Sequence, residues 1–180
     1  MKGLWTVALV LGVLTAGCGG SNSPTAPTAP TPNSNQVKFT ATLLPSNVVP
    51  AITNADASGR GTATITFNLT RDAAGAITAA TADFTLDLNS FPAGTSVTTA
   101  LIHPGAAGAN GGGLIAMGLG AGEIVLVNGT QTGITKTAVT ATAFTAAAAQ
   151  DVINNPSQYY FLVHTALNPG GAARGQLVKQ

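Results

Sequence analysis

Apolar and small polar residues alternate along much of the chain from residue 37 onward. In residues 62–69 and again in residues 81–89 every second position is apolar, which is the period of a half-buried strand. The segment 72–75 between them reads DAAG and has the residues of a tight turn, so the two strands are predicted to pair as a hairpin. Further strands are predicted over residues 37–44, 96–102, 113–117, 123–127, 159–165 and 174–178.

One segment has a helical pattern instead. Residues 144–153 are rich in alanine, and Phe144, Ala148 and Val152 recur at helical spacing before Pro156 stops the pattern. Many short strands, glycine- and proline-rich turns and this one short helix predict an all-β fold. We expect an antiparallel β-sandwich or a Greek-key barrel rather than a parallel sheet.

The N-terminus has the pattern of an export signal. Lys2 precedes an uncharged, mostly apolar run to residue 17, which is shorter than the roughly 20 apolar residues of a membrane span. Residues 14–18 read LTAGC, and they resemble the bacterial lipoprotein processing signal, although Thr15 stands where leucine is usual. The resemblance implies that Cys18, the only cysteine, is lipidated and becomes the first mature residue. The alternative is an unmodified thiol in an ordinary signal peptide or N-terminal anchor.

This interpretation divides the chain into three parts. Residues 1–17 are the predicted signal peptide, and residues 18–36 are the lipidated cysteine followed by a Pro/Thr/Ser-rich linker. The linker favours polyproline II, which would span up to ~50 Å at ~3.1 Å per residue. Residues 37–180 form the predicted β-domain, and Gly19 after the cysteine favours an outer membrane or cell-surface location by analogy with such lipoproteins.

Charge excludes some partners. Without Lys2 the chain has six basic and six acidic residues, so it offers no basic surface for nucleic acid. Charged residues are 7% of the chain, against about 25% in an ordinary domain, so Thr, Ser, Asn, Gln and backbone must cover the surface. With a single cysteine the folded part has no internal disulfide and depends on core packing.

The two histidines lie in two distinctive segments. Residues 100–115 read ALIHPGAAGANGGGLI, and residues 159–177 read YYFLVHTALNPGGAARGQL. Together they resemble the CHRD domain, a module first described in chordin and found in many bacterial secreted proteins. Residues 39–43, 49–50 and 59–65 fit the opening strand, proline turn and second strand of that family. We therefore expect an immunoglobulin-like or superoxide-dismutase-like topology.

Two positions depart from the family pattern. Leu101 replaces the first histidine of an alternating His-Ile-His segment, and the pair Ala172 and Ala173 replaces an acidic residue before the final strand. Alternation places Leu101 on one face with His103, and Tyr160 on one face with His164.

The histidines are candidate ligands for copper or zinc. If their strands are close neighbours, His103 and His164 could meet, but two histidines do not complete a tetrahedral site. A carboxylate from Asp56, Asp83 or Asp87 would have to join them. In the alternative interpretation, both histidines bind backbone groups and organise the glycine-rich loop at residues 105–113.

Arg174 lies between two glycines in the closing segment. We expect its guanidinium to brace loop carbonyls or a carboxylate, and ligand recognition is the less favoured role.

No catalytic residue is predicted. Asp83 and Asp87 would lie about 13 Å apart along one strand, beyond the about 5–9.5 Å used in glycoside hydrolysis, so we interpret them as a solvated face. The glycine-rich segments lack phosphate-loop features, and no Gly-x-Ser-x-Gly motif occurs.

The sequence therefore favours a non-enzymatic, lipid-anchored extracytoplasmic β-domain. It would be held at the membrane through Cys18 and serve as a binding, adhesion or cell-envelope module for a protein or glycan ligand. The alternative function is a copper- or zinc-binding or redox module that uses His103 and His164.

Overall fold

The computed structural model describes residues 35–180. The predicted signal, Cys18 and all but the last two residues of the predicted linker lie outside the described residues. Within the described part no helix is long and apolar enough to cross a membrane.

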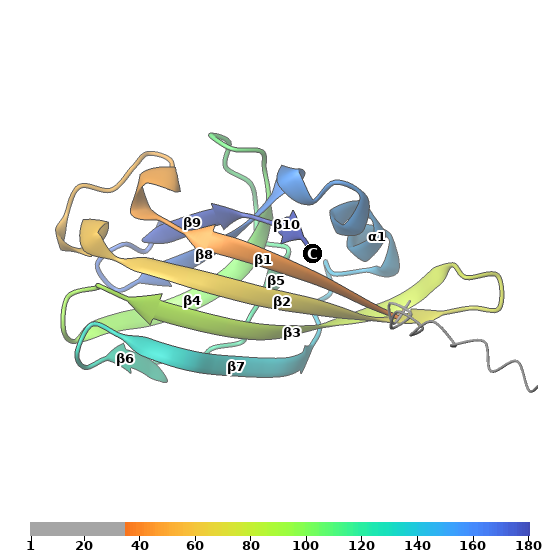
Figure 1. The fold of residues 1–180 in the computed structure, drawn as a ribbon, viewed down its shortest axis with the longest axis horizontal. Coiled ribbons are helices and arrows are strands. Elements are labelled where there is room, and N and C mark those ends of the chain that lie inside the picture. The colour runs from red at the N-terminus through yellow and green to blue at the C-terminus, as the bar shows by residue number, and fades with distance from the viewer. Residues whose placement is uncertain (1–34) are drawn as a thin grey trace, which may run out of the picture. The chain divides into compact units, whose positions relative to one another are not determined.

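The fold is a sandwich of two antiparallel sheets, which confirms the predicted all-β class. In Figure 1 the strands of the first sheet run side by side in front of β4, β8 and β9 of the second. The first sheet has the order β10-β1-β2-β3-β7, with β1 (Gln36–Leu43), β2 (Arg60–Arg71), β3 (Ile77–Asn89), β7 (Gln131–Val139) and β10 (Val178–Lys179). The second has the order β5-β4-β8-β9, with β6 also paired to β4, and comprises β4 (Thr95–Pro104), β5 (Ile115–Ala116), β6 (Ile124–Leu126), β8 (Tyr159–Thr165) and β9 (Ala173–Gln176).

Alternate residues of both sheets form one core. Phe39, Phe67 and Phe84 point inward from the first sheet, and Ile102 and Phe161 point inward from the second, all of them buried. The β2–β3 hairpin forms as predicted, and its turn is fixed because the Asp72 carboxylate accepts from the amides of residues 74 and 76.

The helix and three short turns connect the strands. α1 (Ala146–Asn154) begins two residues later than predicted because the Thr145 hydroxyl caps it by accepting from the amide of Ala148. Phe144 precedes the helix and packs edge-on against Phe67 of the core. The 3₁₀ turns are η1 (Pro45–Asn47), η2 (Ala55–Ser58) and η3 (Pro156–Gln158).

The two sheets join along one edge. Leu44, just after β1, exchanges two backbone hydrogen bonds of 3.0 and 3.1 Å with Arg174 in β9. Here β9 approaches β1 so closely that a Cβ on Gly175 would lie 2.3 Å from the backbone oxygen of Thr42. Position 175 therefore requires glycine, because any Cβ there would clash with the backbone of β1.

The prediction of a single strand over 174–178 is wrong. The chain leaves β9 after Gln176 and enters β10 at Val178, so the segment is shared between two sheets. Leu177, at the crossing, is 2% exposed and belongs to the core.

β7 was not predicted at all. Only Ile134 is buried in this edge strand, and two irregularities interrupt its pairing with β3. Asp83 and Asp87 accept the amides of Ala138 and Gly133 at these irregularities, with both distances 2.7 Å. The two aspartates thus hold β7 against the sheet, which corrects their interpretation as a merely solvated face.

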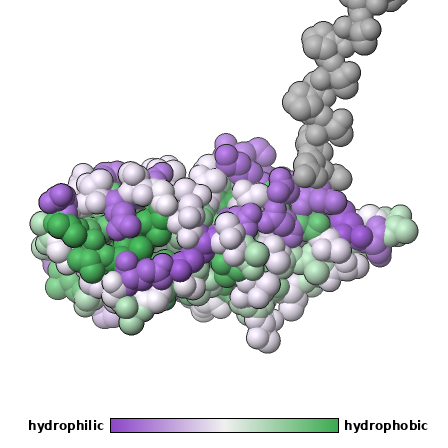
Figure 2. Space-filling view, turned by 90° about the horizontal axis from the view of Figure 1, so that it is seen from below, coloured by the Kyte–Doolittle hydropathy of each residue, from purple (hydrophilic) through white to green (hydrophobic). Residues whose placement is uncertain are grey.

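The surface is poor in charge, as the composition predicts. In the view from below, much of the face has intermediate hydropathy, and apolar surface gathers at one end (Figure 2). The exposed large apolar side chains of residues 35–180 include Val125 in β6 and Val127 just after it.

Candidate functional site

The outer face of the second sheet carries the residues singled out from the sequence. In the strand register His103 lies opposite Tyr160, and Leu162 lies opposite both Leu101 and Arg174. The intervening residues, such as Phe161, point into the core. Strand alternation therefore brings His103, His164 and Arg174 to one side of one sheet.

Two loops cover this face. Val48 packs on Tyr160 and Leu162, and the loop at residues 105–113 lies beside it. The Asn110 amide donates a 2.7 Å hydrogen bond to the carbonyl of Val49 and ties the loops together. The cover shields the sheet from water without any contribution from a disulfide.

Four side chains form a continuous stack beneath the cover. The Arg174 guanidinium lies 3.5 Å from the centroid of the Tyr160 ring. Tyr160 stacks on His103 with ring centroids 5.0 Å apart and planes within 4°. The His164 ring follows, 5.9 Å from that of His103. Tyr160 is therefore the centre of the cluster, whereas strand alternation alone predicts only that it shares a face with His164.

Arg174 braces the glycine-rich loop, as expected. It is 1% exposed and donates to the carbonyl of Ala106 at 2.8 Å and to the side-chain oxygens of Asn110 and Gln176 at 3.3 and 3.2 Å. Its partners are amide oxygens, and it makes no ion pair with any described carboxylate. Burial lowers the pKa of the guanidinium, and Tyr160 opposes that shift.

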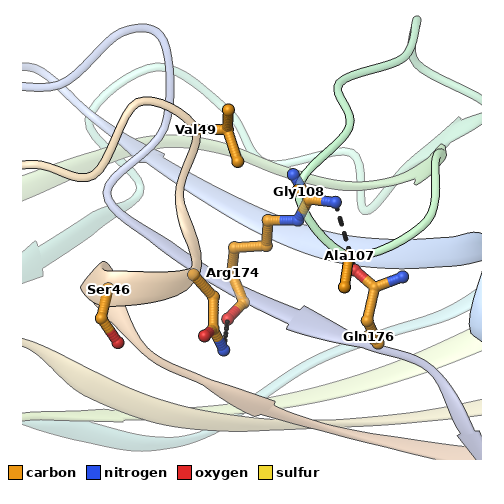
Figure 3. A pocket seen from close by; sticks show the side chains of 7 residues that line it. Ser46, Val49, Ala107, Gly108, Arg174 and Gln176 are labelled. Carbon is orange, nitrogen blue, oxygen red and sulfur yellow. Dashed lines mark hydrogen bonds between the residues drawn. The ribbon is translucent and has the colours of Figure 1, made fainter.

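A hollow of about 250 Å³ opens beside this arginine. Figure 3 shows the Arg174 side chain running from β9 toward Ala107 and Gln176, with Val49 across the hollow. A second hollow of about 400 Å³ lies on the other side of the contact between Val49 and Asn110. Both hollows are lined by a mixture of amide groups and small apolar side chains.

Each histidine is held through its Nδ1 atom. His103 Nδ1 lies 2.9 Å from the carbonyl oxygen of Gly111, and His164 Nδ1 lies 2.8 Å from that of Pro169. A carbonyl oxygen only accepts, so Nδ1 carries a proton in both rings. His103 thus contacts the glycine-rich loop at residues 105–113, whereas His164 contacts the β8–β9 loop instead.

Burial sets the protonation of His103. Desolvation lowers the pKa of this residue below its ordinary value of 6.5, the Gly111 carbonyl opposes the shift, and His164 adds to it. Arg174 acts in the same direction from the far side of Tyr160. The ring is therefore neutral at physiological pH.

The three candidate carboxylates are engaged elsewhere. Asp56 is 1% exposed and accepts from Thr165 and Asn168, both at 2.6 Å. Asp83 and Asp87 hold β7 in the other sheet. Among residues 35–180 no group of three or more His, Cys, Asp or Glu side chains could hold a metal ion.

Sequence reasoning missed two supporting residues. Gln176 lies on the same face and donates to the carbonyl of Gly105, and alternation from Arg174 would have placed it there. Asn110 contacts Arg174 and Val49 from within the glycine-rich loop, where no periodic pattern marks it.

Together, the two antiparallel sheets and the loop-covered outer face define a β-sandwich module. A family model, the CHRD domain, matches residues 39–177. The chain belongs to the CHRD domain family, as the sequence resemblance implied. No curated protein and no solved structure matches the chain.

Proposed function

We propose that the chain is a lipid-anchored extracytoplasmic module without catalytic activity, which binds a glycan or protein of the cell envelope. Membership of the CHRD family favours a module over an enzyme. The anchor is supported by the LTAGC segment at residues 14–18, and Gly19 favours an outer membrane or cell-surface location. Acyl chains on Cys18, at ~0.8 kcal/mol per buried methylene, would hold the domain at the membrane durably.

The observation that carries the binding role is the hollow beside Arg174. Its wall contains a guanidinium with no described anionic partner, together with the amide groups of Asn47 and Gln176. Such groups bind the hydroxyl, carboxylate or carbonyl oxygens of a sugar or peptide. The hydrogen bonds of Arg174 and Gln176 fix the wall of the hollow before a ligand arrives.

The anchor is tested with Cys18→Ser. In cell fractionation we expect this variant to leave the membrane fraction while its thermal unfolding stays that of the parent chain. Retention in the membrane would contradict lipid anchoring, and loss of folding would show that the cysteine belongs to the core.

Binding is tested by filling the hollow. Ala107 is exposed and lines it, so Ala107→Trp would block the space without disturbing the core. Ala73→Trp, in the exposed hairpin turn, is the matched control. The immobilised Cys18→Ser chain should capture a glycan or protein of the cell envelope. The same chain with Ala73→Trp should still capture it, and the chain with Ala107→Trp should not. Equal capture by the two tryptophan variants would exclude the hollow as the binding site.

A second candidate function is metal binding at His103 and His164. It is favoured by one observation, which is that the Nε2 atoms of both rings are buried and have no hydrogen-bond partner.

A further inference from the structure

Two buried nitrogen atoms of the histidine pair have no hydrogen-bond partner. Among the described residues, the Nε2 atoms of His103 and His164 are the only buried side-chain nitrogen or oxygen atoms without a hydrogen-bond partner. Buried polar atoms are almost always paired, and an exception signals a functional group or a bound ion. Here the two exceptions occur in neighbouring rings, with centroids 5.9 Å apart.

The hydrogen bonds at Nδ1 leave both Nε2 atoms ready to coordinate. Because Nδ1 donates to the carbonyl of Gly111 in one ring and of Pro169 in the other, Nε2 is the nitrogen of each ring that is left to bind a metal ion. Histidines that bind metals commonly donate their other ring N–H to a backbone carbonyl, which fixes the tautomer and the ring. The loop contacts thus provide the outer support of a metal site.

The spacing of the rings suits one ion bound to both. With a metal–nitrogen bond of about 2.0 Å and Nε2 about 1.1 Å from the ring centroid, two rings on one ion have centroids about 6.2 Å apart for a linear arrangement and about 5.1 Å for a tetrahedral angle. The observed 5.9 Å falls between these two values, so the ring separation allows one ion to reach both rings.

The surroundings select a monovalent ion of low coordination number. No third histidine, cysteine or carboxylate joins the pair among residues 35–180, and both Nε2 atoms are shielded from water. Zn²⁺ in proteins is bound by four ligands, whereas the lower charge of Cu(I) allows it to be held by two nitrogen ligands in a linear arrangement. The nearby positive charge of Arg174, separated from His103 by the Tyr160 ring, disfavours a divalent ion more than a monovalent one.

We propose that His103 and His164 bind a single Cu(I) ion through their Nε2 atoms as a two-coordinate site. The proposal rests on the second candidate function and specifies its ion and geometry. It is independent of the anchor and of the hollow beside Arg174.

The test uses the full chain with Cys18→Ser, so that the thiol cannot supply a ligand. Cu(I), kept reduced with ascorbate, is titrated against a chromophoric Cu(I) chelator, and X-ray absorption reports the coordination number. The chain has only two histidines, so we expect one ion per chain with two nitrogen ligands. Nitrogen-15 spectra of the rings should show both Nε2 resonances shift when Cu(I) is added.

Single variants separate ligation from folding. His164→Gln, at a half-buried position, should weaken Cu(I) binding by at least about 100-fold, the upper end of the loss for a supporting outer group. His103→Gln should do the same, and unfolding is monitored by circular dichroism. Thr66→Gln, at a half-buried position in β2 of the other sheet, is the control and should leave Cu(I) binding unchanged.

Three results would overturn the proposal, and only the first of them leaves the second candidate function intact. Stoichiometric Zn²⁺ with four ligands at the same histidines would refute Cu(I) while leaving the second candidate function intact. Absence of any stoichiometric metal, or undiminished Cu(I) binding by folded His164→Gln, would refute both.

Discussion

Replacing Arg174 by methionine tests whether this arginine holds the loop cover in place. Methionine keeps an unbranched side chain of similar reach, but it removes the guanidinium and its three hydrogen bonds. The acceptors are the carbonyl of Ala106 and the side chains of Asn110 and Gln176. The variant also removes the cation from the face of Tyr160.

The expected loss follows from these contacts. The 2.8 Å bond to Ala106 is charge-assisted and contributes about 2 kcal/mol, and the two longer bonds about 0.5–1 kcal/mol each. A desolvated cation–π contact adds about 2 kcal/mol. Removing the cost of burying the guanidinium offsets about half of this sum, so we expect a net destabilisation of about 2–3 kcal/mol. At roughly 2–4 °C per kcal/mol, the Tm should fall by about 5–10 °C.

Unfolding should be followed by far-ultraviolet circular dichroism on the Cys18→Ser chain, because the only tryptophan is Trp5, outside the domain. Hydrogen exchange should accelerate in residues 105–113. Arg60→Met is the matched control, since that guanidinium also meets three carbonyl oxygens but is exposed, and its loss should barely change the Tm. If Arg174→Met left both the Tm and the loop exchange unchanged, the bracing role would be refuted.

Three further substitutions or conditions probe the rest of the fold. Gly175→Ala places a Cβ 2.3 Å from the oxygen of Thr42 and should cost about 2–3 kcal/mol in denaturant unfolding, whereas Gly170→Ala, which meets no atom within 4 Å, should cost almost nothing. Asp56→Ala removes the acceptor of the buried Thr165 hydroxyl and one of the two acceptors of the Asn168 amide, and should cost about 2–4 kcal/mol; a smaller loss would mean that these donors find other partners. Because the pKa of His103 is lowered in the folded state, stability should be complete above pH 6.5 and decrease as the pH falls through the folded-state pKa. His103→Gln should lack this decrease, and an identical pH profile would contradict the assignment.

The sequence predicted strands wherever one face is buried and the other is not. The alternation in residues 62–69 and 81–89 indicates a strand with one buried and one exposed face, and β2 and β3 form there. β7 escapes the same reasoning because an edge strand with one buried side chain and two irregularities has no regular period. The division of residues 174–178 between two sheets depends on the approach of β9 to β1, which is a tertiary contact that local patterns do not encode.

The candidate site, too, could be predicted only in part from the sequence. Alternation correctly predicted that Tyr160 and His164 lie on one face, because the face on which a side chain lies is set by its position within a single strand. The contact of the two histidine rings depends instead on the register between β4 and β8, which no tight turn fixes because β5, β6, β7 and α1 lie between them in the chain. The loop acceptors of Arg174 were predicted as a chemical type but not by residue.

The course of β1 has a mechanical consequence. This strand begins at Gln36, where the N-terminal segment joins the domain, and runs to Leu43, next to the bond between Leu44 and Arg174 (Figure 1). A pull between the N-terminus and a ligand beside Arg174 would therefore act along β1. Ladder hydrogen bonds lie perpendicular to the strands, so such a load would shear the pairing from Gln36 to Leu43 as a whole and not open it bond by bond. If the chain is anchored and binds a ligand as proposed, the tension between anchor and ligand would run along this strand.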